Sequence, residues 1–289
     1  MNRTFWKELW LLLVCIAGGL AALPVAYAPL ELYYIYAQRE PNVVFSMHFL
    51  QWMQTFLVML IPAFVWYRWR FKKDAVTDFG FRRFEWRSMC LTFFLMLCMF
   101  PAMEFITYVC YTMPLPQPLQ DMMNAAKIEE FEAMNIMLGS DGILMGWVEP
   151  ILLVSIATAI GEEAMFRGAV YKCFDFTSLN KHWVAILVGL IFSLIHFDIS
   201  GFVPRWILGT LFCYLVIWTG SIWPCILAHA MNNLFSLIGF RLEPVQDPLD
   251  PPVLFFSWYI TLLSFIAGIA LIFIFQKQYS RHQEMLRHC

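Results

Sequence analysis

The chain has 289 residues, of which 61% are hydrophobic and 14% are charged, and its formal net charge is −2. Soluble domains are roughly 45–50% apolar, so this composition excludes an ordinary soluble protein and predicts a lipid bilayer as the surrounding medium. The 19 Lys and Arg residues lie in short clusters and form no basic face, so the sequence predicts no nucleic-acid partner.

Hydropathy predicts an all-α, polytopic membrane protein of about eight transmembrane helices, because a helix crosses the roughly 30 Å hydrocarbon core with about 20 apolar residues. The chain, residues 1–289, is expected to form a single integral membrane domain. In chain order, the predicted spans are residues 9–29, 44–67, 88–112, 142–172, 182–197, 203–219, 221–240 and 253–275. The fourth span is long for one crossing, so we expect it to tilt, to project from the bilayer or to break near Pro150.

Two connecting segments differ in composition from the spans around them. Residues 68–87 alternate basic and aromatic side chains, a pattern typical of a stretch that lies in the headgroup region of an anionic leaflet. Residues 113–141 are acidic and contain proline, so they are predicted to form a solvent-exposed loop.

The distribution of positive charge predicts the orientation of the spans. Cytoplasmic loops are rich in Lys and Arg, and eight alternating spans with the N-terminus inside place nearly all of these residues, including Arg167, on the cytoplasmic side. The exceptions are Arg39, Lys127, Arg205 and Arg241. Both termini are therefore predicted to be cytoplasmic, in a protein integral to the inner or cytoplasmic membrane of the cell.

The fourth span carries the sequence GEEAMFR, with adjacent carboxylates at Glu162 and Glu163. An ionisable side chain within a membrane helix costs about 2.5–3.5 kcal/mol on insertion scales, so its presence suggests function. Glu163 and Arg167 are four residues apart and share a helix face, where Arg167 can neutralise one carboxylate. Glu162 points about 100° away. The alternative is that the whole cluster is a structural ion pair at a helix end.

Histidines occur in the fifth and seventh spans. The fifth ends with Phe192, three further residues and His196, and the seventh holds His229 and Asn233, which share a helix face. Each motif has a structural alternative, because a lone histidine can cap a helix and an asparagine can simply join membrane helices.

The predicted depths of these residues agree with one another. At about 1.5 Å per residue, Glu162 lies ~15 Å from Lys172, His196 lies ~22 Å from Lys181, and His229 lies ~14 Å from Gly220. All three depths are near the middle of the bilayer. A single hydrated site requires this agreement, whereas independent structural residues do not.

These side chains supply what amide hydrolysis requires, namely a base for water, donors for the oxyanion and a proton for the leaving amine. Glu162 with His196 would activate water, and His229 with Asn233 would face the carbonyl. A divalent metal such as zinc is an equal alternative, with Glu162, His196 and His229 as candidate ligands around an open water position.

The motifs resemble those of the CPBP family of intramembrane proteases, also called the Abi family, which includes CAAX prenyl endopeptidases and bacteriocin-processing proteins. EExxxR is matched by Glu162, Glu163 and Arg167, FxxxH by Phe192 and His196, and HxxxN by His229 and Asn233. The order and spacing agree over a core of residues 142–240, whereas the other spans resemble the family only in being hydrophobic.

The resemblance implies an eight-helix endopeptidase that acts on a membrane-associated or prenylated protein, by either a metal-dependent or a glutamate-dependent mechanism. It implies that Glu162 is the general base, that Glu163 supports it and is oriented by Arg167, and that His196 helps to activate water. His229 and Asn233 would form the oxyanion hole. Two alternatives to this function remain, a proton-coupled transporter or channel that relays protons through Glu162, Glu163 and His196, and a catalytically idle membrane scaffold.

Overall fold

The computed structural model describes residues 3–71, 79–81, 85–139, 143–242, 247–252 and 254–287. Within these ranges every regular element is a helix, so the predicted all-α fold is confirmed. Six of the described helices are long and apolar enough to cross a membrane, which confirms a polytopic membrane protein, while the number eight stays a prediction. These helices are Arg3–Ala37, Val43–Arg70, Trp86–Thr112, Phe202–Thr219, Trp223–Leu242 and Trp258–Tyr279.

The chain divides into two compact units, each built from two separate stretches of sequence. Unit 1 comprises Met1–Phe79 and Glu129–Leu179, and unit 2 comprises Gly80–Ile128 and Asn180–Cys289. The predicted core of residues 142–240 is therefore shared between the units, with the EExxxR motif in unit 1 and the two histidine motifs in unit 2. The single membrane domain expected for the whole chain stays a prediction.

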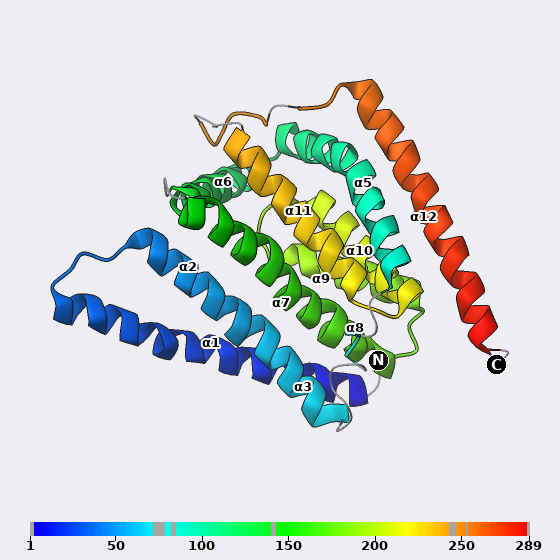
Figure 1. The fold of residues 1–289 in the computed structure, drawn as a ribbon, viewed down its shortest axis with the longest axis horizontal. Coiled ribbons are helices and arrows are strands. Elements are labelled where there is room, and N and C mark those ends of the chain that lie inside the picture. The colour runs from blue at the N-terminus through cyan, green and yellow to red at the C-terminus, as the bar shows by residue number, and fades with distance from the viewer. Residues whose placement is uncertain are drawn as a thin grey trace. The chain divides into compact units, whose positions relative to one another are not determined.

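Unit 1 is a packing of three long helical stretches. Figure 1 shows α1 (blue) lying alongside the continuous stretch from α2 to α3, and the EExxxR helix packs against this pair. The first two stretches consist of α1 (Arg3–Ala37), α2 (Val43–Gln54), η1 (Thr55–Leu60) and α3 (Ile61–Phe71). The third consists of η2 (Leu144–Val148), η3 (Ile151–Ala157), α7 (Thr158–Glu163), η4 (Ala164–Val170), α8 (Tyr171–Cys173) and η5 (Phe174–Phe176).

The third stretch is helical without interruption from residue 143 to residue 176, so the break considered near Pro150 does not occur. Pro150 has helical dihedral angles, and a π-helical segment, Ile151–Ala157, follows it directly. Proline lacks an N–H and its ring clashes with the preceding turn, so a local widening of the helix is one way to keep the chain helical. A further π-helical segment, Ala164–Val170, begins directly after Glu163.

Gly168 allows the EExxxR helix to approach Phe79 closely. Phe79 is fully buried in unit 1, where it stacks on Phe64 with ring centroids 4.8 Å apart. A Cβ atom at position 168 would collide with the Phe79 ring. A side chain at this position therefore forces either the aromatic ring or the helix to move.

We expect Gly168→Ala to lower the free energy of unfolding by about 1–3 kcal/mol, because overpacking forces side chains and backbone to shift. Gly18→Ala is the matched control, since it is also a helical glycine but a Cβ there meets nothing within 4 Å. The control should be neutral or slightly stabilising because alanine favours helix. Unfolding titrations with SDS in mixed micelles compare the variants, and equal stabilities would contradict the packing account.

The structure corrects the expectation of a solvent-exposed loop within residues 113–141, because most of the described part of this segment is helical. Residues Gln117–Leu138 form helix α6, which bears its acidic residues on exposed positions and buries Met123, Met137 and Leu138. Pro118 stands in the first helical turn, where a missing N–H costs nothing. Composition alone did not predict this amphipathic helix, because acidic residues and proline are also typical of loops.

Lys127 is a buried cation on α6. Its side chain is 7% exposed, and its Nζ lies 2.9 Å from the centroid of the Tyr111 ring. Burial lowers the pKa of Lys127 to about 8, although the charge of Asp198 acts in the opposite direction. At neutral pH the ammonium is charged in both the folded and the unfolded protein, and only the folded protein bears the cost of burying it.

We expect Lys127→Met to raise the free energy of unfolding by about 1–2 kcal/mol at pH 7, because this burial cost disappears. Between about pH 8 and about pH 10.5, the folded wild-type protein loses this proton before the unfolded chain does. The free energy of unfolding of the wild type therefore rises over this range and approaches that of the variant. SDS unfolding at pH 7 and pH 10 measures the difference in free energy of unfolding between the wild type and the variant, which should be smaller at pH 10. Lys181→Met controls for the loss of an exposed cation. A difference that is constant with pH would contradict the prediction.

Unit 2 contains α5 (Trp86–Thr112), α9 (Lys181–Leu194), α10 (Phe202–Thr219), α11 (Trp223–Leu242) and α12 (Trp258–Arg287). Its apolar core brings together side chains of α5, α10, α11 and α12, including Leu95, Phe212, Ala228 and Phe275. Figure 1 shows α12 (red) lying along α5. Helices α9 and α10 meet at Gly189, where a Cβ would lie 2.6 Å from the backbone nitrogen of Thr210. Small residues at such crossings let membrane helices pack backbone to backbone.

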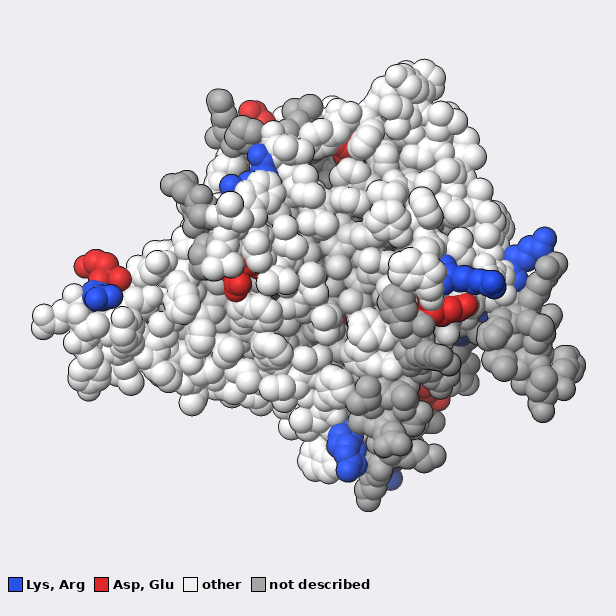
Figure 2. Space-filling view, viewed as in Figure 1, with Lys and Arg blue, Asp and Glu red and all other residues white. Residues whose placement is uncertain are grey.

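The surface of the described residues suits a lipid environment. Large apolar side chains are exposed along the long helices, among them Trp10, Val25, Phe94, Leu263 and Phe273. In Figure 2 most of the face shown is uncharged, with Lys, Arg, Asp and Glu in a few separate places. Of the segment predicted to lie in the headgroup layer, residues 72–78 and 82–84 lie outside the described residues.

Candidate functional site

The EExxxR motif forms a buried ion pair at the junction of α7 and η4. Arg167 Nη1 donates to Glu163 Oε1 at 2.8 Å, and neither side chain is exposed to solvent. The spacing of four residues predicted this pair, and the structure confirms it. Glu163 is therefore neutralised by a cation within its own helix, which is the arrangement that makes a buried carboxylate tolerable.

The burial of Arg167 also removes it from the positive charges that predict the orientation of the spans. The orientation argument took Arg167 as a cytoplasmic charge at the end of a span, but its guanidinium is bound within the helix packing of unit 1. It therefore carries no information about which loop faces the cytoplasm. The remaining clusters still favour cytoplasmic termini, and this orientation stays a prediction.

Glu162 differs from Glu163 in its environment. It is partly exposed, whereas Glu163, the next residue along the chain, is fully buried. Consecutive residues of a helix point about 100° apart, so the two carboxylates leave the helix on different faces. Glu162 is partly exposed as a residue, although its Oε2 is buried, whereas Glu163 is fully buried in the ion pair with Arg167.

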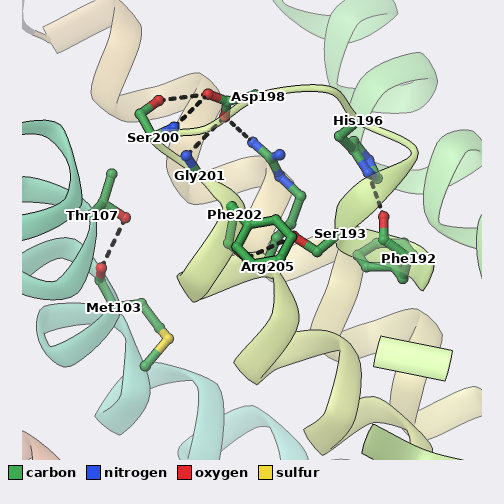
Figure 3. Close-up of polar contacts among 10 residues, drawn as sticks. All are labelled: Met103, Thr107, Phe192, Ser193, His196, Asp198, Ser200, Gly201, Phe202 and Arg205. Atoms are coloured by element: carbon green, nitrogen blue, oxygen red, sulfur yellow. Dashed lines mark hydrogen bonds and ion pairs between the residues drawn. The ribbon is translucent and has the colours of Figure 1, made fainter. Parts of the chain in front are cut away.

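His196 lies beyond the end of its helix, which corrects the prediction that residues 182–197 form one span. Helix α9 ends at Leu194, and His196 is in the turn that leads to α10. Its ring is held by a 2.7 Å hydrogen bond between Nδ1 and the carbonyl oxygen of Phe192, shown in Figure 3. A carbonyl oxygen only accepts, so Nδ1 carries the proton and, in the neutral ring, the lone pair is on Nε2.

His229 is buried between aromatic rings of unit 2. It is 5% exposed, stacks on Phe212 at 5.7 Å between ring centroids, and meets the Phe192 ring edge to face at the same distance. Phe192 also contacts the His196 ring at 5.0 Å. The phenylalanine of the FxxxH motif therefore lies against both histidines, and it fixes the orientation of each ring.

Asn233 lies one turn beyond His229 on α11 and is partly exposed. Asn232 Nδ2 and Asn233 Oδ1 are 3.5 Å apart, at the long limit for a hydrogen bond. With Oδ1 turned to its neighbour, the Asn233 amide directs Nδ2 elsewhere as a donor. Unit 2 thus brings Phe192, His196 and His229 together and presents Asn233 on the same helix as His229.

Asp198 is a polar residue of the site that the motifs did not reveal. It lies two residues after His196 and accepts hydrogen bonds from the backbone nitrogens of Ser200 and Gly201, both at 2.9 Å. It also pairs with Arg205, which the sequence had placed only as an outer charge. An acidic residue a few positions before a helix, followed by Ser and Gly, is the sequence signal of a helix-start turn and could have indicated it.

Several groups set the charge state of Asp198. Burial raises its pKa, but donation from Ser200, the positive charge and hydrogen bond of Arg205 and the Gly201 N–H together outweigh burial, so the pKa lies below its ordinary value. The carboxylate therefore remains ionised at neutral pH.

Glu149, which lies in the same helical stretch as the EExxxR motif, has a structural partner. Trp52 Nε1 donates to its Oε1 at 2.7 Å within unit 1. This bond joins α2 to the EExxxR helix and accounts for a carboxylate in an apolar segment.

The metal alternative places its ligands in different units, with Glu162 in unit 1 and His196 and His229 in unit 2. Across the described part of the chain, no group of three or more His, Cys, Asp and Glu side chains is arranged to hold a metal ion. The metal alternative stays a prediction, and the mechanism below routes no step through a metal.

Two comparisons identify the matching core. Residues 144–235 match the family described as "Type II CAAX prenyl endopeptidase Rce1-like". The protein named "Putative membrane peptidase YdiL" of Bacillus subtilis (strain 168) is 31% identical over 100 residues, which cover 35% of this chain and 40% of that relative. No solved structure matches the chain.

The family match falls on the segment that carries the three motifs, and the two comparisons together confirm the resemblance to the CPBP family of intramembrane proteases. The chain spans less than half of the length of the curated relative. The protein is thus an integral membrane protein in which residues 144–235 resemble the proteases of the CPBP family.

Proposed function

We propose that the protein is an intramembrane endopeptidase that hydrolyses a peptide bond of a membrane-associated or prenylated protein. The observation that carries the proposal is the state of the two adjacent carboxylates: Glu163 is paired with Arg167 and fully buried, while Glu162 is partly exposed. Of the two adjacent carboxylates, Glu162 is the one that is not bound in the buried ion pair with Arg167, and general-base catalysis requires such a carboxylate.

In the proposed mechanism Glu162 removes a proton from water, and the oxygen attacks the carbonyl carbon of the scissile bond. His196 accepts a hydrogen bond from the same water through Nε2, because the Phe192 carbonyl holds the proton on Nδ1. The C–N bond then breaks, and Glu162 returns the proton to the leaving amine. The products are a carboxylic acid and an amine, which exchange a proton to give a carboxylate and an ammonium ion, and Glu162 is restored.

The tetrahedral intermediate carries a negative charge on the former carbonyl oxygen, which two donors of α11 would stabilise. His229 donates from its ring and Asn233 from Nδ2. The rings of Phe192 and Phe212 exclude water around His229, and hydrogen bonds in such a low-dielectric setting stabilise charge strongly. Because the rings also fix the imidazole, the donor needs little reorganisation during the reaction.

The proposal is tested with purified protein in lipid nanodiscs and two probe peptides, a farnesylated peptide that ends in a CAAX sequence and an unlipidated peptide with one transmembrane segment. Mass spectrometry locates any cleavage. We expect cleavage of at least one probe by the wild-type protein and none by Glu162→Gln. Cleavage of neither probe, or equal cleavage by both proteins, would overturn the proposal, and proton-coupled uptake in liposomes would then favour the transporter.

We expect Asn233→Ala to lower kcat about 100-fold with little change in KM, because it removes a donor needed only in the transition state. Ser236→Ala is the control, since Ser236 is an exposed residue of the same helix whose hydroxyl donates to the Asn232 carbonyl. Steady-state kinetics on the cleaved probe distinguish the two. A proportional rise in KM with an unchanged kcat would contradict an oxyanion role for Asn233.

A further inference from the structure

The turn between α9 and α10 is a short connection with a strained centre. Backbone bonds continue from the end of α9 through it, with the His196 nitrogen 3.3 Å from the Ser193 carbonyl and the Phe197 nitrogen 3.2 Å from that of Leu194. Phe197 has a φ of +52°, in the left-handed region that bulky side chains avoid. The turn that bears His196 is therefore not the conformation its own residues prefer, and other contacts must hold it.

Those contacts come from Asp198. Its Oδ1 accepts from both the backbone nitrogen of Ser200, at 2.9 Å, and the Ser200 hydroxyl, at 2.6 Å. Its Oδ2 accepts from the Gly201 nitrogen at 2.9 Å and pairs with Arg205 in the first turns of α10. Figure 3 shows these bonds gathered on one carboxylate. A single side chain thus joins the turn to the start of α10.

The His196 ring is held between two anchors as a result. On one side its Nδ1 is bonded to the Phe192 carbonyl in the last turn of α9. On the other side, Asp198 follows His196 by two residues and fixes the chain there, because it binds the Gly201 nitrogen and Arg205 of α10. Without the second anchor, Phe197 can relax to negative φ, and the backbone of His196 moves with it.

We propose that Asp198 is a positioning residue for catalysis, which holds the left-handed turn after His196 so that Nε2 of this histidine meets the attacking water. This inference rests on the proposed function. Asp198 touches neither water nor substrate in the proposed mechanism, and its effect reaches the reaction through the backbone of residues 196–201.

The inference distinguishes Asp198 from a residue that only stabilises the fold. Loss of stability lowers the amount of active protein but leaves the kcat of the folded molecules unchanged. Displacement of His196 instead lowers kcat in folded protein and leaves KM nearly unchanged, because substrate binding does not use Nε2. A misplacement of about 1 Å is enough to lower the rate roughly 100-fold.

The test compares Asp198→Ala and Asp198→Asn in nanodiscs, on whichever probe peptide the wild-type protein cleaves. We expect Asp198→Ala to lower kcat about 10- to 100-fold with KM within about twofold. Asparagine keeps an oxygen that accepts from Ser200 but loses the ion pair with Arg205. We therefore expect Asp198→Asn to recover about tenfold in kcat relative to alanine.

Thr219→Val is the matched control, at the opposite end of α10. Thr219 also holds a turn, since its hydroxyl donates to the Leu215 carbonyl at 2.7 Å and accepts from the Ser221 nitrogen at 3.2 Å. The control should lose stability without a change in kcat. Hydrogen exchange provides an independent readout, in which faster exchange at Ser200 and Gly201 is expected in Asp198→Ala but not in Thr219→Val.

The outcomes separate the two proposals. Wild-type cleavage that depends on Glu162, together with an unchanged kcat in Asp198→Ala, would overturn the positioning role alone. An equal loss of kcat in Asp198→Ala and Thr219→Val would also overturn it, because the effect would then be general. Absence of Glu162-dependent cleavage in the wild-type protein would overturn the proposed function and the positioning role together.

Discussion

Glu162→Gln is expected to abolish peptide cleavage, with a fall in kcat of at least about 1,000-fold and no loss of folded protein. Glutamine has nearly the same shape as glutamate but cannot accept a proton from water. Glu162 is partly exposed and lies outside the ion pair that joins Glu163 to Arg167, so the substitution leaves that pair in place. Steady-state cleavage of the probe peptides measures the effect, and SDS unfolding confirms that the variant is folded.

Glu149→Gln is the matched control for this experiment. Glu149 is another carboxylate of the same helical stretch, and its Oε1 accepts from Trp52, a bond that the glutamine oxygen retains. We expect nearly normal cleavage by Glu149→Gln. Comparable loss of activity in both variants would indicate a general sensitivity of this helix to neutralised carboxylates and would contradict a specific role for Glu162.

Arg167→Met is expected to be the most destabilising of the substitutions considered, with a loss of about 3–5 kcal/mol in the free energy of unfolding. The substitution leaves the Glu163 carboxylate in a fully buried position without its cation. A buried charge cannot recover its hydration energy without a partner, so the helix must either open or take up a proton at Glu163.

The double variant Glu163→Leu/Arg167→Met tests the cause of this loss. Replacement of a buried ion pair by apolar residues of similar volume is often neutral or stabilising, so we expect the double variant to regain most of the lost stability. SDS unfolding of the wild type, both single variants and the double variant gives the coupling energy. If the double variant is as unstable as Arg167→Met, the packing of the arginine side chain, and not charge pairing, determines the stability of this region.

The double variant also separates stability from catalysis. If Glu163 acts only through its pair with Arg167, a folded double variant retains part of the cleavage activity, because Glu162 is still present. If Glu163 takes part directly in the reaction, the folded double variant is inactive. Cleavage kinetics of the stable double variant thus decide whether Glu163 only supports the site or takes part in the reaction.

Features that depend on local spacing were predicted correctly from the sequence. The pairing of Glu163 with Arg167 needed only a helix, because residues four apart share a face in any α-helix and remain in reach across the π-helical segment that follows. Asn233 likewise follows His229 on one helix, as the HxxxN spacing required. Neither result depends on the rest of the chain.

Features that depend on a helix end were predicted less well. Residues 195–197 are as apolar as the helix before them except for His196, so hydropathy extended the span through the histidine. The helix in fact ends at Leu194, where Ser193 donates to the Phe202 carbonyl at 2.6 Å and Asp198 fixes the start of α10. Polar contacts between separate segments set this boundary, and hydropathy does not register them.

By itself the sequence determined that the chain is a helical membrane protein, that its core resembles the CPBP family, and which side chains of one helix share a face. Its apolar content demands lipid, and helical periodicity is a property of the backbone. Only the tertiary structure decided that Arg167 is buried and is not a loop charge, that the Phe192 carbonyl selects the tautomer of His196, and that Asp198 holds its turn. These results depend on burial and on contacts between residues of different segments, which arise only when the helices pack.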